Sequence, residues 1–157
     1  MTLFRMPAIA IALLVGLASP AIVRAEDARI TVVAILGSSA HSEINPKLQQ
    51  IAAEVRKHDT SLTGFKILST ECKDVNVGQV ESFPVAKDIS VDVTVKAKYE
   101  SKNKIKLTVK PPMMGEVTYS VTYDKFMPIM TRQMANNERL IIAIMAQQPK
   151  AKDLPPK

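Results

Sequence analysis

The 157-residue sequence contains one cysteine, Cys72, and no tryptophan. A single thiol cannot form an intramolecular disulfide, so the fold must be held together by an apolar core. Because free cysteine is among the most buried residue types, we expect Cys72 to be buried. The chain also lacks Cys-x-x-Cys and His-x-x-x-His spacings and any glycine-rich phosphate loop. Neither a zinc site nor a nucleotide site is therefore predicted.

Groups that exchange protons or attack substrates are scarce as well, because the chain has only two histidines, His41 and His58. The stretch GSSAH places Ser38 and Ser39 near His41, but a Ser-His pair needs a rigid mount and a third, orienting group. This segment is expected to be a loop. His58 follows the last turn of an expected helix, where histidine interacts with free carbonyl groups. The sequence therefore predicts a protein that is not an enzyme and has no catalytic residues.

The first 25 residues carry no acidic side chain and have the pattern of a signal peptide. Arg5 precedes the apolar stretch MPAIAIALLVGLA, and small residues at Val23 and Ala25 predict cleavage after Ala25. No second long apolar run follows, so no transmembrane segment is expected after cleavage. We expect residues 26–157 to be periplasmic or secreted.

The rest of the chain predicts one domain over residues 26–146. Asn45 and Pro46 signal a helix start, and apolar residues recur at helical spacing from Leu48 to Val55. Alternating apolar and polar residues predict half-buried antiparallel strands; we expect strands at 29–36, 64–69, 74–83, 88–99, 104–110 and 116–124. LIIAIMA (140–146) is apolar throughout, which is typical of a central strand covered on both faces.

This pattern predicts an α+β fold. We expect a single antiparallel β-sheet of about six or seven strands with one amphipathic helix packed on one face. The polar, proline-rich residues 147–157 are expected to form a disordered tail.

Five stretches, namely VVAIL, NPKLQQIAAEV, GFKIL, NVGQVESF and LIIAIMA, occur in this order over residues 30–146. In this respect the chain resembles a family of small exported bacterial α+β proteins with no assigned activity. The resemblance implies an exported domain and assigns no functional residues. In similar proteins a glycine-rich segment is expected before the last strand, where this chain has methionines.

Those methionines are the first candidate site. Met127, Met130 and Met134 lie within eight positions, and Met113 and Met114 lie just upstream. Thioether sulfur selects Cu(I), so the cluster is a possible periplasmic copper site. The alternative, which we favour, is that these flexible side chains fill irregular gaps in the apolar packing.

The second candidate is a stripe of lysines on the hairpin of strands 88–99 and 104–110, which could bind an envelope polyanion: Lys96, Lys98, Lys104, Lys106 and Lys110. The alternative is a solubilising face that blocks unwanted strand pairing. No aromatic residue lies among these lysines on that face, so nucleic acid is not expected as a partner. Without Arg5 and Arg24, the 21 basic residues fall to 19 against 15 acidic residues, which is only mildly basic.

Our leading interpretation is a non-enzymatic exported interaction or assembly domain without a cofactor. Its partner would be an envelope protein or a second copy of the chain. The free edges and open face of a broad sheet are the features that would bind it.

Overall fold

The structure, a computed structural model, describes residues 27–101 and 103–148. The predicted signal peptide and residues 149–157 of the predicted disordered tail lie outside this part. The elements are β1 (Asp27–Ser38), η1 (Pro46–Leu48), α1 (Gln49–His58), β2 (Gly64–Asn76), β3 (Val80–Ala86), β4 (Ile89–Ser101), β5 (Lys104–Lys110), β6 (Val117–Thr122), β7 (Met127–Ala135) and β8 (Glu138–Ala146).

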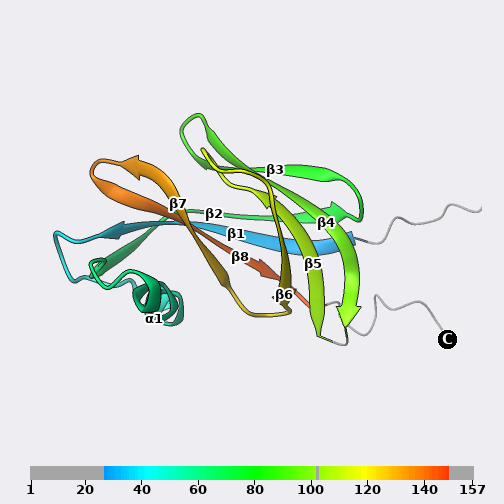
Figure 1. Cartoon of the computed structure of the whole chain (residues 1–157), viewed down its shortest axis with the longest axis horizontal. Helices are drawn as coiled ribbons and strands as arrows, with labels where there is room; N and C mark the ends of the chain where they lie inside the picture. The colour runs from blue at the N-terminus through cyan, green and yellow to red at the C-terminus, as the bar shows by residue number, and fades with distance from the viewer. Residues whose placement is uncertain (1–26, 102, 149–157) are drawn as a thin grey trace, which may run out of the picture.

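The strands form two four-stranded antiparallel sheets that pack face to face (Figure 1). Sheet A has the order β2-β1-β8-β7, and sheet B has the order β3-β4-β5-β6. The predicted α+β fold with a single sheet of six or seven strands is therefore wrong. The protein is a mostly β sandwich with one short helix.

The reason for this difference is the small size of the helix. The ten residues of α1 span only about 15 Å. A sheet of six or seven strands is roughly 30 Å wide and buries one whole face. A single short helix cannot cover such a face, so the alternating strands β3–β6 form a second sheet that covers the other face of sheet A.

Two apolar clusters result, and sheet A separates them. The first lies between the sheets and includes Val93, Leu107 and Ile142, all 0 % exposed. The second lies between α1 and the outer face of sheet A and includes Val55 and Ile141. Neighbouring residues of β8 thus enter different clusters. This confirms the prediction that LIIAIMA is a central strand covered on both faces.

The helix begins as its sequence predicts. The Asn45 side chain accepts a hydrogen bond from the backbone amide of Lys47 at 3.0 Å, and Pro46 opens the first turn. Leu48, Ile51 and Val55 are buried against sheet A. Within the described residues, no helix is long and apolar enough to cross a membrane.

Two strand assignments differ from the expectation. The predicted strands 64–69 and 74–83 are one long strand β2 and a separate strand β3, because the turn between them falls at Gly78, whose φ is +86°. The segment 127–135 is the edge strand β7 of sheet A. The sequence predicts a methionine cluster there and no strand.

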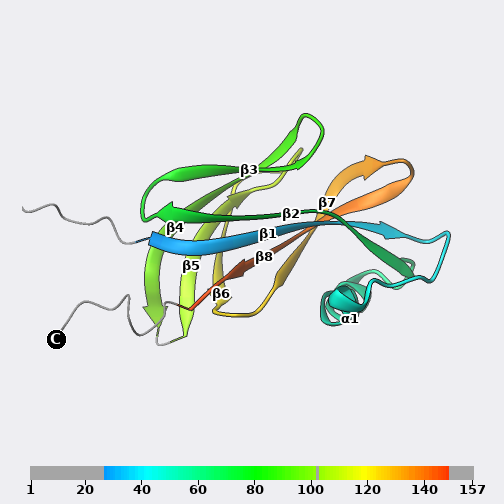
Figure 2. The ribbon, with the colours of Figure 1, turned by 180° about the vertical axis from the view of Figure 1, so that it is seen from behind.

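The sandwich has two ends, which Figures 1 and 2 show from opposite sides. We call the end that holds α1, the loop 39–45 and the β7–β8 turn the tip. We call the opposite end, where the β4–β5 turn lies, the base. There, backbone hydrogen bonds join Tyr123 to Asn103 and Asp124 to Ala146.

Candidate functional site

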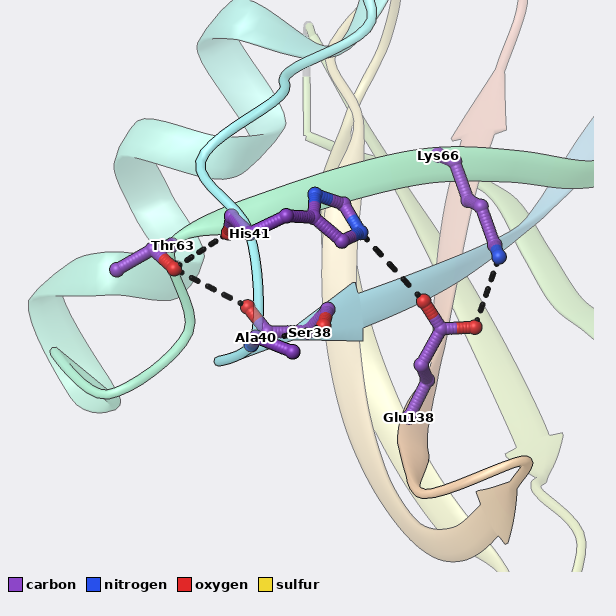
Figure 3. Close-up of polar contacts among 6 residues, drawn as sticks. All are labelled: Ser38, Ala40, His41, Thr63, Lys66 and Glu138. Atoms are coloured by element: carbon purple, nitrogen blue, oxygen red, sulfur yellow. Dashed lines mark hydrogen bonds and ion pairs between the residues drawn. The ribbon is translucent and has the colours of Figure 1, made fainter.

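The strongest concentration of interacting charges lies at the tip and centres on Glu138 (Figure 3). Glu138 follows the two-residue turn of the β7–β8 hairpin, in which Asn136 and Asn137 have φ values of 52° and 64°. Asparagine tolerates this left-handed conformation, which tight hairpin turns require. The turn places the Glu138 carboxylate where it is only 9 % exposed.

Two basic side chains from other parts of the chain lie near this carboxylate. Lys66 Nζ of β2 lies 2.9 Å from one carboxylate oxygen, and His41 Nε2 of the loop after β1 lies 3.6 Å from the other. Placing a carboxylate in a little-exposed position is costly unless it is paired, so the contact with Lys66 stabilises Glu138 at this place. The cluster ties together three segments that are distant in sequence.

The loop that carries His41 is fixed by hydrogen bonds and by close packing. The Thr63 hydroxyl donates to the carbonyl oxygen of His41 at 2.6 Å, and the amide of Ala40 donates to Ser38 Oγ at 3.1 Å. The His41 ring lies directly on Gly64, where an added Cβ would be 2.2 Å from Nδ1. Only glycine fits at this position, so the site is preorganised by the backbone.

A second ion pair fixes the end of α1 to the same region. Arg139 of β8 donates to Asp59 at 2.9 Å. The hydroxyl and amide of Ser61 also donate to Asp59. The hydrogen bond from the Ser61 hydroxyl is the main cause that lowers the pKa of Asp59, and the nearby Arg139 lowers it further.

An open pocket of about 420 Å³ lies beside the Glu138 cluster. Its lining combines the titratable residues His41, Glu43 and Lys66 with the apolar residues Ile44 and Phe65. Phe65 is 1 % exposed and belongs to the cluster under α1, so this part of the lining is packed into the core. Such a mixed, open pocket suits a contact from a protein or peptide side chain better than an enclosed small molecule.

The tip does not have the geometry of a nucleophilic site. His41 Nε2 faces Glu138. Ser38 is buried, and its side-chain oxygen accepts a hydrogen bond from a backbone amide. A Ser-His nucleophile would need the hydroxyl to face the imidazole. Among the described residues, no group of three or more His, Cys, Asp or Glu side chains is placed to hold a metal ion.

The structure does not bring the candidate methionines together. Met127 packs against the cluster between the sheets, whereas Met130 packs against the cluster under α1 on the opposite face of sheet A. Met134 is 49 % exposed beyond a register shift in β7. Met113 and Met114 lie in the β5–β6 turn of the other sheet. This placement supports packing as the role of Met127 and Met130, since one ion cannot be bound from both faces of a sheet.

The candidate lysines separate into two groups. Lys106 stands opposite Ala97 and Lys104 opposite Ser101, so Lys96, Lys98, Lys104 and Lys106 gather near the β4–β5 turn at the base. Lys110 lies at the far end of β5, where it stands opposite Asp92. The base therefore holds four of the five lysines.

Cys72 is exposed, so the expectation of a buried thiol is wrong. It lies on the edge strand β2, and its sulfur accepts hydrogen bonds from Arg29 Nε at 3.3 Å and Thr31 Oγ1 at 3.5 Å. These contacts with Cys72 raise the pKa of the Arg29 guanidinium, and the charge of Asp74 adds to this. Exposed and half-buried residues alternate along this part of β2, and Cys72 lies on the exposed side.

Sequence reasoning missed Glu138, Lys66 and Asp59, the residues that form the tip. The pair Asn136–Asn137 before an apolar strand was an available signal for a hairpin turn. No local pattern, however, indicates that a carboxylate after that turn meets a lysine 72 positions earlier, because this contact depends on the order of strands in sheet A.

The fold and the tip together define an antiparallel β-sandwich with a charged, preorganised tip. Comparison of the chain with protein-family models, with curated proteins and with solved structures gave no match. The function is therefore argued from the geometry alone.

Proposed function

We propose that this chain is a non-enzymatic interaction domain, periplasmic or secreted, that binds a protein partner at its tip. The observation that carries the proposal is the open pocket beside the Glu138–Lys66–His41 cluster. Its partner is an envelope protein or a second copy of the chain.

Three features of the tip support binding. The pocket is open, and its apolar floor is bordered by charges of both signs, as in the polar rim of a protein interface. The loop is preorganised by Gly64 and Thr63, which reduces the entropy lost on binding. The unpaired edge of β7 is shielded by Pro128 and a register shift, so strand addition at this edge is disfavoured and the pocket is the better docking point.

The proposal is tested by site-specific photo-crosslinking in the cells that make the protein. A photoreactive residue at Glu43, on the exposed rim of the pocket, should give one discrete adduct. The mass of the adduct distinguishes a second copy from a different protein. Combining the probe with Lys66→Ala, which removes the nearer partner of Glu138, should weaken the adduct.

The matched control carries the same probe at Ser90, which is exposed on the outer side of sheet B. A discrete adduct from position 43 that is absent from position 90 supports the proposal. Equal labelling at both positions, or no adduct at position 43, contradicts it. Turnover of a substrate that depends on His41 would contradict the non-enzymatic assignment.

A further inference from the structure

The basic charge of this protein is concentrated in one hairpin. Residues 94–110 contain six lysines and one glutamate, a net charge of +5, whereas the whole chain carries +6. The remaining residues of 26–157 contain 13 basic and 14 acidic side chains. Outside the β4–β5 hairpin, residues 26–157 therefore carry a net charge of only −1.

The fold brings Lys96, Lys104 and Lys106 to the outer side of sheet B at the base. Lys104 and Lys106 alternate with the buried Ile105 and Leu107, so their side chains lie on the face opposite the core. Lys96 is the additional residue at the register shift between Val95 and Ala97, and it is exposed. The cations thus occupy two neighbouring strands, which are about 5 Å apart.

The neighbouring strand β6 adds hydroxyl groups to this face. Thr118, Ser120 and Thr122 of β6 stand opposite Thr108, Lys106 and Lys104 of β5. Ammonium and hydroxyl groups are the donors that bind phosphate oxygens.

We propose that this basic face docks the domain on a membrane surface rich in anionic phospholipids, with the lysines binding the phosphate headgroups. The lysines lie on one face of a sheet and are spread over two strands, so they can contact several headgroups of a membrane surface at once. Lys98 and Lys106 also make interactions within the fold, so Lys96 and Lys104 carry the proposal. Two acidic groups oppose it: Asp124, which is exposed at the base, and Glu100, which the sequence places within the hairpin.

This surface is at the opposite end from the tip, so the inference goes beyond the proposed function and stands independently of it. Each lysine that lies near an anionic leaflet raises the binding constant by roughly a factor of five, and this attraction weakens as the salt concentration rises. Removing two of them should therefore weaken membrane binding by roughly tenfold or more.

The test measures co-sedimentation of the protein spanning residues 26–157 with vesicles of phosphatidylcholine that contain 30 % phosphatidylglycerol, at about 20, 100 and 500 mM NaCl. Wild type should bind these vesicles at low salt, release at high salt and ignore pure phosphatidylcholine. The double variant Lys96→Gln, Lys104→Gln should bind about tenfold more weakly.

The matched control is Lys47→Gln, Lys87→Gln, which removes the same charge at two exposed positions outside the basic face. Equal weakening of vesicle binding by both double variants would overturn the proposal, because binding would then depend on net charge and not on this face. Absence of vesicle binding at low salt would also overturn it. So would retention on soluble polyphosphate without vesicle binding, which would assign the face to a soluble polyanion. None of these outcomes affects crosslinking from position 43.

Discussion

At the scale of single residues, Gly64 is the position where the tip tolerates least change. A Cβ there would lie 2.2 Å from His41 Nδ1 and 2.7 Å from its carbonyl oxygen. We expect Gly64→Ala to lower the free energy of unfolding by about 1–3 kcal/mol, because the histidine loop must move away. Urea denaturation measures this loss.

Gly115→Ala is the control for this substitution. Its Cβ would meet no atom within 4 Å, and its backbone conformation is one that other residues adopt. It should change stability by less than about 0.5 kcal/mol. If both variants were equally stable, the tight packing of His41 on Gly64 would be refuted.

The exposed thiol of Cys72 gives a second prediction at this scale. Arg29 Nε lies 3.3 Å from the sulfur, and a cation at this distance attracts anionic reagents. The ratio of the alkylation rates with iodoacetate and iodoacetamide should fall roughly threefold to tenfold in Arg29→Gln. Arg132→Gln, on the opposite edge of sheet A, should leave the ratio unchanged, and an equal fall there would exclude a local effect.

How far the sequence predicts single residues depends on how local their surroundings are. The cap at Asn45 involves an amide two positions away, and its sequence signal is correct. The surroundings of Glu138 come from segments that meet only after the sheet has formed. In the sequence, a charged residue at such a position looks like any charged residue of the surface, so the tip could not be predicted.

At the scale of elements, the end of α1 depends on Asp59 and on pH. Because the folded state lowers the pKa of Asp59, its ionised form stabilises the protein above the ordinary aspartate pKa of about 3.9. This stabilisation is lost as the pH falls through the lower folded pKa. Wild type should therefore be more stable than Asp59→Asn at pH 7, and the difference should vanish as the solution is acidified below about pH 4.

Urea denaturation of both proteins between pH 7 and pH 2 measures this difference. Asp88→Asn, at an exposed turn position far from α1 in the other sheet, is the control. A constant difference between wild type and Asp59→Asn over the whole range would show that the carboxylate charge has no role.

Strand β7 provides a prediction about independent packing. Met127 and Met130 contact different clusters, so Met127→Ala and Met130→Ala should each cost roughly 2 kcal/mol or less, since both are only partly buried. The two losses should add to within about 0.5 kcal/mol in the double variant. A larger coupling, or loss of a measured Cu(I) affinity in either single variant, would show that the two side chains act as one site.

The sequence did not indicate that 127–135 is a strand because its alternation is interrupted. One side of β7 faces the sandwich and the other faces the α1 cluster, so apolar residues occur at both parities. A register shift then breaks the period between Met130 and Met134. In sheet B, strands β4, β5 and β6 each have one wet face, and the sequence predicted them near their observed bounds.

At the scale of the whole molecule, sheet A is a shared wall between two cores. Ile141 and Ile142 are adjacent and both 0 % exposed, but they belong to different clusters. Each Ile→Val substitution should cost about 1 kcal/mol. Hydrogen exchange should accelerate mainly in α1 for Ile141→Val and mainly in β4 and β5 for Ile142→Val. The same exchange pattern in both variants would show that the two cores open together.

The sequence predicted six or seven strands in one sheet, whereas the described residues form eight strands in two sheets. Alternation shows that each strand has one apolar face, but it does not show what covers that face. Because α1 is too short to cover the apolar face of a broad sheet, its length indicates that a second layer is required.

The length of β1 has a consequence for how the two ends act. Its 12 residues separate the base from the tip by about 40 Å. Ions screen charges over about 8 Å at physiological ionic strength. A surface that binds the base is thus several screening lengths away from the pocket. The domain would therefore hold the pocket well away from that surface. Removing the lysines of the base should then leave the electrostatic potential at the pocket unchanged.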